Sequence, residues 1–382
     1  MGSDVILVIV VGTALAFDFT NGFHDTANAV ATSVSTRAMS PQLAVASSAV
    51  LNFVGAFVSI KVASTIARGI VVQDAVSLKV IMAGLIGAIT WNLLTWFFGL
   101  PSSSSHALIG GVGGAVLAAS GTNAIKWTGL KEKVLIPSLL APVLGMIGAG
   151  VLVVLCTWLI ARRRPGMVNR LFRRLQLLSG GFVAFTHGTN DAQKTMGIMT
   201  LALISSGELG KNADPPLWVI LSAATALAAG TWFGGWRIIR TLGQNVTKLS
   251  PLQGFSAQTA CATILWMTAH YGYPVSTTHA ISGSVLGAGA TQRFSAVRWG
   301  VAGNILVAWL LTIPCAALVG AGMETLTRVP GGSGITFVVA AGICAFFFLA
   351  RRRQTHGASA HPPASPPAPT TAPEELAGAG KV

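Results

Sequence analysis

The stretch VIMAGLIGAITWNLLTWFFGLPSSSSHALIGGVGGAVLAA (residues 80–119) decides the fold class. It begins with an apolar run of about twenty residues, the length that a helix needs to span a bilayer. The run stops at Pro101, four serines follow, and a second apolar, glycine-rich run then begins. Proline ends a helix, and serine is a preferred N-cap for the next one. The stretch therefore predicts two membrane helices joined by a polar turn.

The turn PSSSSH (101–106) has a chemical consequence. A helix that starts there leaves its first N–H groups without intrahelical partners, and such groups bind anions. Within a membrane, irregular backbone is tolerated only where protein buries it or where it lines a cavity. One such turn alone would be interpreted as a capped bend. A second turn, PVSTTH (274–279), lies in the other half of the chain, and this repetition favours an anion site built from hydroxyl groups.

The composition of the whole chain also indicates a membrane protein. Of its 382 residues, 52% are hydrophobic and 9% are charged, whereas soluble domains carry about 25% charged residues. The apolar runs do not alternate as the strands of a membrane barrel do. The net charge of +14 comes from cations in short segments beside apolar runs, above all RRRPGMVNRLFRR (162–174). This positive-inside pattern marks cytoplasmic edges, so no nucleic-acid partner is expected.

The chain contains the same arrangement twice. NGFHDTANAVA (21–31) precedes the first hydroxyl turn, and HGTNDAQKTMG (187–197) precedes the second. Weak internal symmetry with interrupted helices in matching positions is typical of secondary transporters. We therefore expect an all-α polytopic membrane protein with two inverted-topology repeats, broken helices and two re-entrant helical hairpins.

Four segments follow from this interpretation. The first transmembrane repeat is predicted at 1–161 and the second at 179–353, with a basic cytoplasmic loop at 162–178 between them. Residues 354–382 are rich in proline and alanine and cannot bury a core, which predicts a disordered tail. The expected location is the inner (plasma) membrane, as a multi-pass protein.

Three aspartates lie within or against apolar runs. An unpaired carboxylate at the bilayer centre costs several kcal/mol, so such residues usually face a polar pathway. Asp25 and Asp191 occupy matching positions in the two copies, and their oxygens, at unwound helix ends, are predicted to bind a proton or Na⁺. Asp18 is interpreted as a boundary or helix-capping residue.

An anion site beside two carboxylates would repel its ligand unless the carboxylates first take up cations. Thermodynamic linkage between the two sites therefore predicts coupled transport. Lys194 is the only basic residue so close to either acid in the sequence. Two roles stay open for it, pairing with Asp191 or helping to hold the anion.

Four histidines accompany these motifs, and histidine titrates near neutrality. His24 is the best candidate for a proton carrier, and His187 is a weaker one. His106 and His279, at the turns, are assigned a structural role. No close pair of histidines or cysteines at helical spacing predicts a zinc site.

Four segments together closely resemble the inorganic phosphate transporter (PiT) family, particularly its proton-coupled, low-affinity bacterial members. They are NGFHDTANAVATSVSTRAM (21–39), FGLPSSSSHALIG (98–110), HGTNDAQK (187–194) and YPVSTTHAISG (273–283). The resemblance covers about residues 5–350. It implies an inverted-repeat transporter in which cation sites flank a phosphate site.

Carried over to this chain, the resemblance implies two sets of site residues. Phosphate would be held by Ser102, Ser103, Ser104, Ser105, Ser276, Thr277 and Thr278, and we add Gln193 and Lys194. The coupling cation would be bound by His24, Asp25, Asn28, Asn190 and Asp191. His24 stands where the broader family tends to have asparagine, which favours the proton-coupled branch over a pure Na⁺ mechanism. That branch implies a substrate of phosphate complexed with a divalent metal such as Mg²⁺.

The function that we predict is import of inorganic phosphate by cation symport, with H⁺ favoured over Na⁺. A sulfate permease of the same fold is the alternative. An intramembrane hydrolase is less favoured, because no GxSxG context occurs, so the chain is not expected to be an enzyme. No cofactor or resident metal is expected. The expected partners are inorganic phosphate, the coupling cation and the lipid bilayer, and a homodimer is left open.

Overall fold

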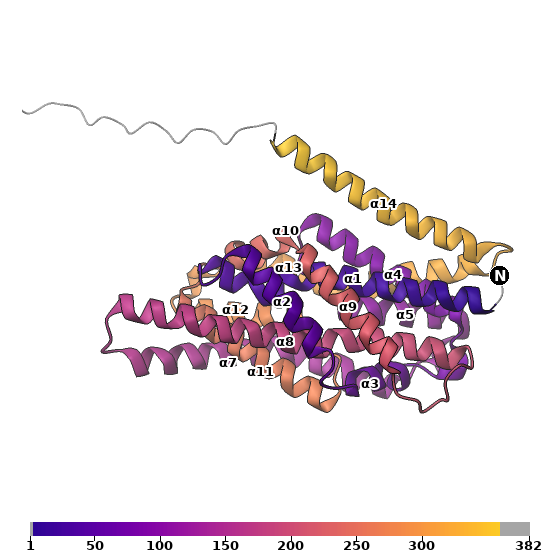
Figure 1. Ribbon diagram of the computed structural model, residues 1–382, viewed down its shortest axis with the longest axis horizontal. Helices are drawn as coiled ribbons and strands as arrows, with labels where there is room; N and C mark the ends of the chain where they lie inside the picture. Colours follow the sequence, from indigo (N-terminus) through magenta and orange to yellow (C-terminus); the bar gives the residue numbers. More distant parts are fainter. Residues whose placement is uncertain (1–2, 360–382) are drawn as a thin grey trace, which may run out of the picture.

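The computed structural model describes residues 3–359 (Figure 1), and its regular secondary structure is helical. The α-helices are α1 (Ser3–Ser35), α2 (Pro41–Gly55), α3 (Lys61–Gly69), α4 (Leu78–Phe98), α5 (Ser104–Ser120), α6 (Trp127–Leu130), α7 (Ile136–Ile160), α8 (Pro165–Ser205), α9 (Leu217–Phe233), α10 (Trp236–Arg240), α11 (Pro251–Tyr271), α12 (Thr277–Ala290), α13 (Trp299–Thr327) and α14 (Gly332–Ser359). Short 3₁₀ turns lie at η1 (Gln73–Ala75), η2 (Thr122–Ala124) and η5 (Phe294–Ala296), and π-helical turns at η3 (Lys131–Leu135) and η4 (Thr241–Asn245). The predicted all-α class is confirmed.

Several of these helices have the length and composition of membrane spans. Within residues 3–359 there are four, Asp4–Ser35, Leu78–Phe98, Trp127–Ile160 and Trp299–Thr327, or five if α9 and α10 are counted as one span bent by 63°. Large apolar side chains on α7 point outward, among them Leu139 and Trp158. An exposed apolar face of this kind is stable against lipid and not against water, so the polytopic class is also confirmed.

The helices form one bundle in which the two halves of the chain are interleaved. Helices α4 and α5 pack on each other as one hairpin, and α11 and α12 as a second. The first hairpin packs on α13, which follows the second hairpin in the chain, and the second packs on α7, which follows the first. The contacts of the two halves therefore match, while the inversion of one half stays a prediction. Figure 1 shows the bundle lengthwise, with α14 projecting along one side.

Each hairpin is held against its partner helix by two glycines spaced four residues apart. A Cβ atom at Gly114 would lie 2.2 Å from the carbonyl oxygen of Ala317 in α13, and one at Gly287 would lie 2.0 Å from that of Met146 in α7. Only glycine permits such close approach of two helix backbones. This packing fixes where the first turn of α5 and of α12 lies in the bundle.

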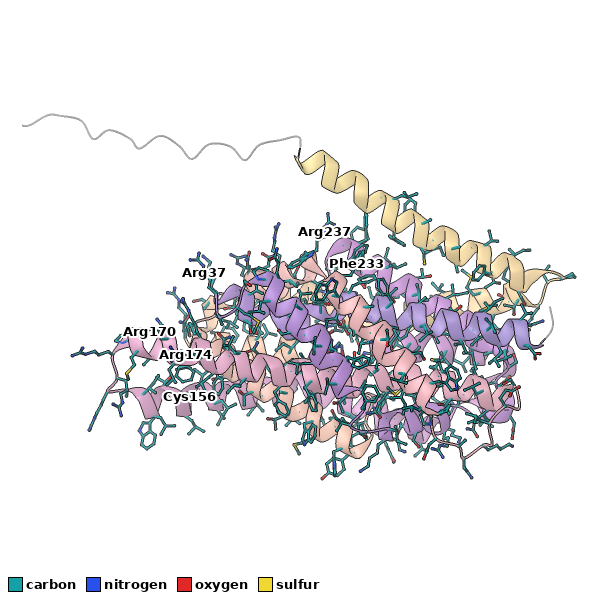
Figure 2. All side chains as sticks on the ribbon, in the orientation of Figure 1. Arg37, Cys156, Arg170, Arg174, Phe233 and Arg237 are labelled. Carbon is teal, nitrogen blue, oxygen red and sulfur yellow. The ribbon has the colours of Figure 1, made fainter. Side chains whose placement is uncertain are left out.

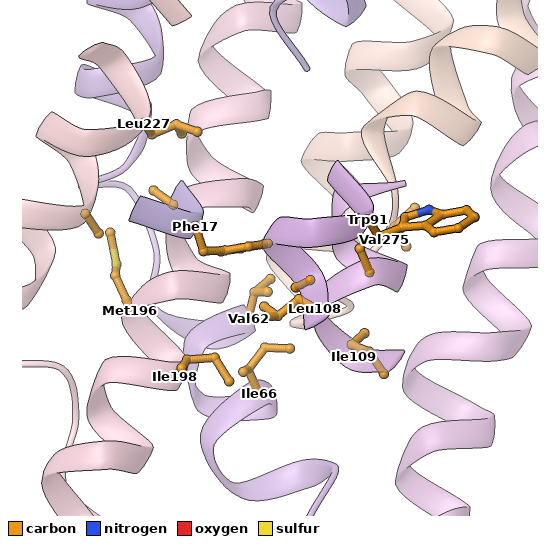
Figure 3. Close-up of a cluster of buried hydrophobic side chains, with 14 of the residues drawn as sticks. Phe17, Val62, Ile66, Trp91, Leu108, Ile109, Met196, Ile198, Leu227 and Val275 are labelled. Atoms are coloured by element: carbon orange, nitrogen blue, oxygen red, sulfur yellow. The ribbon is translucent and has the colours of Figure 1, made fainter. Parts of the chain in front are cut away.

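The centre of the bundle is filled by apolar side chains. Figure 3 shows Phe17 of α1, Leu108 of α5 and Met196 of α8 in this cluster, and all three are fully buried. Val275, from the turn between α11 and α12, belongs to the same cluster. The cluster therefore packs α5 and the turn before α12 against α1 and α8, the helices that carry the acid motifs.

Three local expectations from the sequence are wrong. The segment expected as a basic loop, 162–178, is helical from Pro165 onward, because proline suits the first turn and arginine is a good helix former. Figure 2 shows Arg170 and Arg174 of this segment at the end of the molecule opposite the N-terminus. Residues 354–359 continue α14 instead of joining the predicted tail, since an established helix extends readily. The rest of that tail, 360–382, lies outside the described residues.

The third correction concerns the acid motifs. Both lie inside continuous helices, α1 and α8, and not at unwound helix ends. The breaks predicted for the chain occur at the hydroxyl turns, between α4 and α5 and between α11 and α12. The reason is local chemistry, since the acid motifs contain no proline and the turns do. The acids are thus presented to the site from rigid helices.

Candidate functional site

The two hydroxyl turns have the same backbone geometry. The first helix of each hairpin ends at a glycine in the left-handed region, Gly99 with φ 69° and Gly272 with φ 75°. Four residues later, Ser103 and Ser276 cap the second helix. Their side-chain oxygens accept hydrogen bonds from the N–H three residues on, at 3.1 and 3.3 Å. The N-caps predicted from the sequence are confirmed. The two turns also match in this capping hydrogen bond.

Beyond the caps, the first turn of each helix offers free donors. No hydrogen bond within residues 3–359 satisfies the backbone N–H groups of Ser104, Ser105, Thr277 and Thr278. Their side chains are buried as well. Four unpaired amides at two helix N-termini make an electropositive cradle for an anion.

The two turns meet in space, although 173 positions separate Ser103 from Ser276 in the sequence. The hydroxyl of Ser105 donates to the carbonyl of Val275 at 3.5 Å. The rings of His106 and His279 contact edge to face with centroids 4.7 Å apart. His106 Nε2 lies 2.8 Å from the hydroxyl of Ser138, and His279 Nδ1 lies 3.4 Å from the same residue's carbonyl oxygen. These contacts agree with the structural role assigned to both histidines.

Asp25 lies between the two turns and connects them. Ser104, from the first hairpin, donates to Asp25 Oδ2 at 2.7 Å. Thr278, from the second, donates to Asp25 Oδ1 at 3.5 Å. His24 Nδ1 lies 2.7 Å from the same Oδ1. One carboxylate therefore holds hydroxyl groups of both halves together with an imidazole.

The neighbours of Asp25 on α1 extend this network. Asn28 donates to the hydroxyls of Thr277 and Thr278, both at 3.0 Å. On the other side, His24 Nε2 lies 3.1 Å from Thr95 Oγ1 and 3.3 Å from Ser102 Oγ. The residues predicted on α1 are thus brought to the hydroxyl turns.

The second acid, Asp191, is paired with Lys194. The ammonium nitrogen lies 2.5 Å from Asp191 Oδ1, and both side chains are at most 1% exposed. Lys194 also donates to the hydroxyl of Ser105 and, at 3.3 Å, to the carbonyl of Val275. Both roles left open by the sequence are therefore compatible with its position, because the ammonium bridges the acid and the two turns.

Two side chains at this acid were not among the predicted cation ligands, although His187 was named as a weaker proton carrier. His187 Nε2 lies 3.3 Å from Asp191 Oδ2, and Asn21 donates to the same oxygen at 3.4 Å. Ligand atoms of Asp25, His187 and Asp191 all lie within 4.8 Å of one another, and all three residues are buried. The signal was present in the sequence, since His187 precedes Asp191 by four positions, which places them on one helix face.

Two predicted residues lie elsewhere. Gln193 accepts hydrogen bonds from the N–H groups of Val62 and Ala63 at 2.8 and 3.3 Å, and so caps α3. Asn190 points toward α11, where it donates to the carbonyl of Leu265 at 3.4 Å. Neighbours of Asp191 in sequence point to other faces of α8, because successive helical residues are separated by about 100°. The geometry thus gives neither residue a contact with the hydroxyl turns.

Asp18 corrects another expectation. It lies in the interior of α1 and is fully buried, so it is neither a boundary residue nor a helix cap. The helix continues past Asp18 to Ser35.

The comparisons with known proteins identify the family of this chain. Residues 21–320 match the model of the phosphate transporter family. A Mycobacterium tuberculosis protein named "Probable low-affinity inorganic phosphate transporter" is 52% identical over 333 residues, which cover 86% of this chain and 79% of the relative. Proteins of the same name from Rhizobium meliloti and Bacillus subtilis are 50% and 44% identical. Each alignment covers 83% of this chain, and 95% and 96% of the relative.

A solved structure described as "The sodium-dependent phosphate transporter" has a similar fold. The TM-score is 0.79 at 25% sequence identity, and the match covers 85% of this chain and 99% of that one. These relatives are named as transporters, and this chain is likewise a multi-pass membrane transporter and not an enzyme. The chain belongs to the phosphate transporter family.

Proposed function

We propose that this protein imports inorganic phosphate across the inner (plasma) membrane by symport with a cation, and that H⁺ is the coupling ion. The observation that carries the proposal is the position of Asp25, whose carboxylate binds one hydroxyl from each hairpin. The two turns that would hold phosphate are thereby tied to a titratable group.

Phosphate would bind at the first turns of α5 and α12. The amides of Ser104, Ser105, Thr277 and Thr278 supply donors, their hydroxyls supply more, and the ammonium of Lys194 supplies positive charge. A tetrahedral oxyanion needs donors from several directions, and two facing helix N-termini provide them. The side chains of Ser103 and Ser276 are occupied as caps, so their contribution is to hold this geometry.

Coupling follows from electrostatics. Two unit charges about 4 Å apart repel by about 4 kcal/mol at an effective dielectric of about 20, which is roughly a thousandfold in affinity. Phosphate would therefore bind weakly while Asp25 and Asp191 are both ionised. A cation taken up by the acids removes this repulsion, and a neutral Asp25 would also hold the hydroxyls of Ser104 and Thr278 less firmly.

The side chains that contact the two acids favour a proton over Na⁺ as the coupling ion. His24 contacts Asp25, and His187 contacts Asp191, so an imidazole lies beside each acid. Hard cations such as Na⁺ prefer a shell of oxygen ligands, and Lys194 already occupies one side of Asp191. We further propose that phosphate enters as a complex with a divalent metal such as Mg²⁺, which belongs to the substrate and would lower its negative charge.

The test is uptake of labelled phosphate into proteoliposomes that contain the purified protein. H⁺ and Na⁺ gradients are imposed separately, with and without Mg²⁺. We expect uptake driven by the H⁺ gradient and enhanced by Mg²⁺. Uptake that follows only the Na⁺ gradient would contradict H⁺ coupling, and strong competition by excess sulfate would indicate a sulfate carrier.

Variants of the two acids test the site itself. Asp25→Asn and Asp191→Asn should lose uptake while still reaching the membrane, and Asp214→Asn, in an exposed loop, is the control. Near-normal uptake in both site variants would refute the proposal.

A further inference from the structure

Asp18 carries a buried carboxyl group that the proposed site does not use. The residue is fully buried in α1, and within residues 3–359 neither of its oxygens accepts a hydrogen bond. The other two buried acids of the bundle centre are different, since Asp25 accepts hydrogen bonds from Ser104 and Thr278 and Asp191 pairs with Lys194. An ionised carboxylate without a counter-ion costs several kcal/mol inside a membrane.

The position of Asp18 on its helix connects it to the site. Asp18, Asn21, Asp25 and Asn28 are spaced by three, four and three residues, so they lie on one face of α1. All four are buried. Asn21, between the two aspartates, donates to Asp191 at 3.4 Å. The polar face of α1 therefore runs from the hydroxyl turns, past the second acid, to Asp18.

The groups that face Asp18 come from this face and from α8. The polar side chains are Asn21 and Thr195, and the charged ones are Asp191 and Lys194. The Oδ1 atom of Asn21 and the hydroxyl of Thr195 are also buried without a hydrogen-bond partner in the described chain. Helix α9, which packs on α1, has no titratable residue, and α4 has only Lys79 in its first turn.

These groups do not supply a counter-charge for an ionised Asp18. Lys194, the one cation among them, is committed to Asp191 at 2.5 Å. Asp191 is itself an acid, and its charge opposes a second negative charge nearby. A neutral carboxyl removes the conflict, and its O–H group can donate to an oxygen such as Asn21 Oδ1.

We propose that Asp18 is a further proton-binding site of this carrier, loaded in the conformation described here and emptied when its surroundings open to water. The O–H bond of Asp18 then breaks, and the proton passes to water on the receiving side of the membrane. This inference rests on the proposed H⁺ symport and adds to it a proton that does not compete with phosphate for the hydroxyl turns.

The experiment compares Asp18→Asn with wild type in proteoliposomes. Three quantities are measured: phosphate counterflow without a gradient, the stimulation of uptake by an inward H⁺ gradient, and the number of protons taken up per phosphate, followed with an internal pH dye. Asparagine mimics the protonated carboxyl, so we expect the variant to fold and to keep counterflow. The H⁺ stimulation should fall, and the proton count should drop by one.

The controls separate this inference from the proposed function. Asp25→Asn should lose H⁺-driven uptake, Asp18→Glu should restore part of the proton coupling, and Asp214→Asn should resemble wild type. An unchanged proton count in Asp18→Asn, loss of its counterflow, or failure of the neutral variant to fold would each overturn the assignment of Asp18. Absence of phosphate transport by wild type would instead overturn the proposed function.

Discussion

Replacing Lys194 by methionine keeps the length of the side chain and removes its ammonium group. In the structure that group is buried, lies 2.5 Å from Asp191 and also binds Ser105. Removing one partner of a buried ion pair leaves the other charge uncompensated, which costs about 3–5 kcal/mol. Lys194→Met should therefore lower the free energy of unfolding by this amount.

The double variant Asp191→Asn with Lys194→Met should recover most of the loss. Replacing both members of a buried pair by neutral groups of similar size is often neutral or stabilising, so we expect a net change within about 1 kcal/mol of wild type. Unfolding in detergent, followed by denaturant titration, measures wild type, both single variants and the double variant. If the two single losses simply add in the double variant, the side chains are not coupled and the reasoning is wrong.

The same variants distinguish the two roles of Lys194 when phosphate binding is measured, because uptake is already lost once Asp191 is neutral. A lysine that serves only as a counter-ion can be dispensed with in that background, so the double variant would bind labelled phosphate as Asp191→Asn does. Because the ammonium also contacts the Ser105 turn, we expect a stable double variant that binds phosphate more weakly than Asp191→Asn. Lys211→Met is the control, since Lys211 pairs with Asp74 in exposed loops and should cost at most about 1 kcal/mol.

Three further predictions concern the hairpins and the imidazole. Gly114→Ala should destabilise the bundle by about 1–3 kcal/mol, because its Cβ would lie 2.2 Å from a carbonyl oxygen of α13. Gly113→Ala, one residue earlier with open space around it, should be neutral or stabilising in the same unfolding assay. Ser103→Ala removes an N-cap and should cost about 1 kcal/mol; a glycine at this position should cost less. Thr95→Val removes a hydroxyl 3.1 Å from His24 and should shift the pH profile of phosphate uptake without loss of expression, so an unchanged profile would argue against a role of His24 in coupling.

Local signals explain what could be predicted for the fold. Apolar runs of spanning length require helices in a bilayer, because every backbone polar group must be satisfied within the segment. Proline followed by hydroxyl residues ends one helix and caps the next within a few positions, and Ser103 and Ser276 do so as expected. The same reasoning failed at 162–178, where cationic residues were taken as a loop although they continue a helix from Pro165.

The site was predicted in part for the same reason. Duplication in the sequence singled out Asp25 and Asp191, and the structure places both beside the hydroxyl turns. The sequence could not show which face of α8 is turned to the centre of the bundle. Gln193 therefore entered the predicted site, although it caps α3, and His187 was named only as a weaker proton carrier, although it contacts Asp191.

The sequence by itself thus determined the helical membrane class, the duplicated motifs and the two capped turns, because each depends on residues that are neighbours in the chain. Only the tertiary structure decided which side chains share a site. Asn28 and Thr277 are 249 positions apart and form a hydrogen bond, and Asp18, close to Asp25 in sequence, accepts no hydrogen bond within the described residues. Burial and partners of a charged group depend on how distant helices pack, and this packing determines which protonation states the group can adopt.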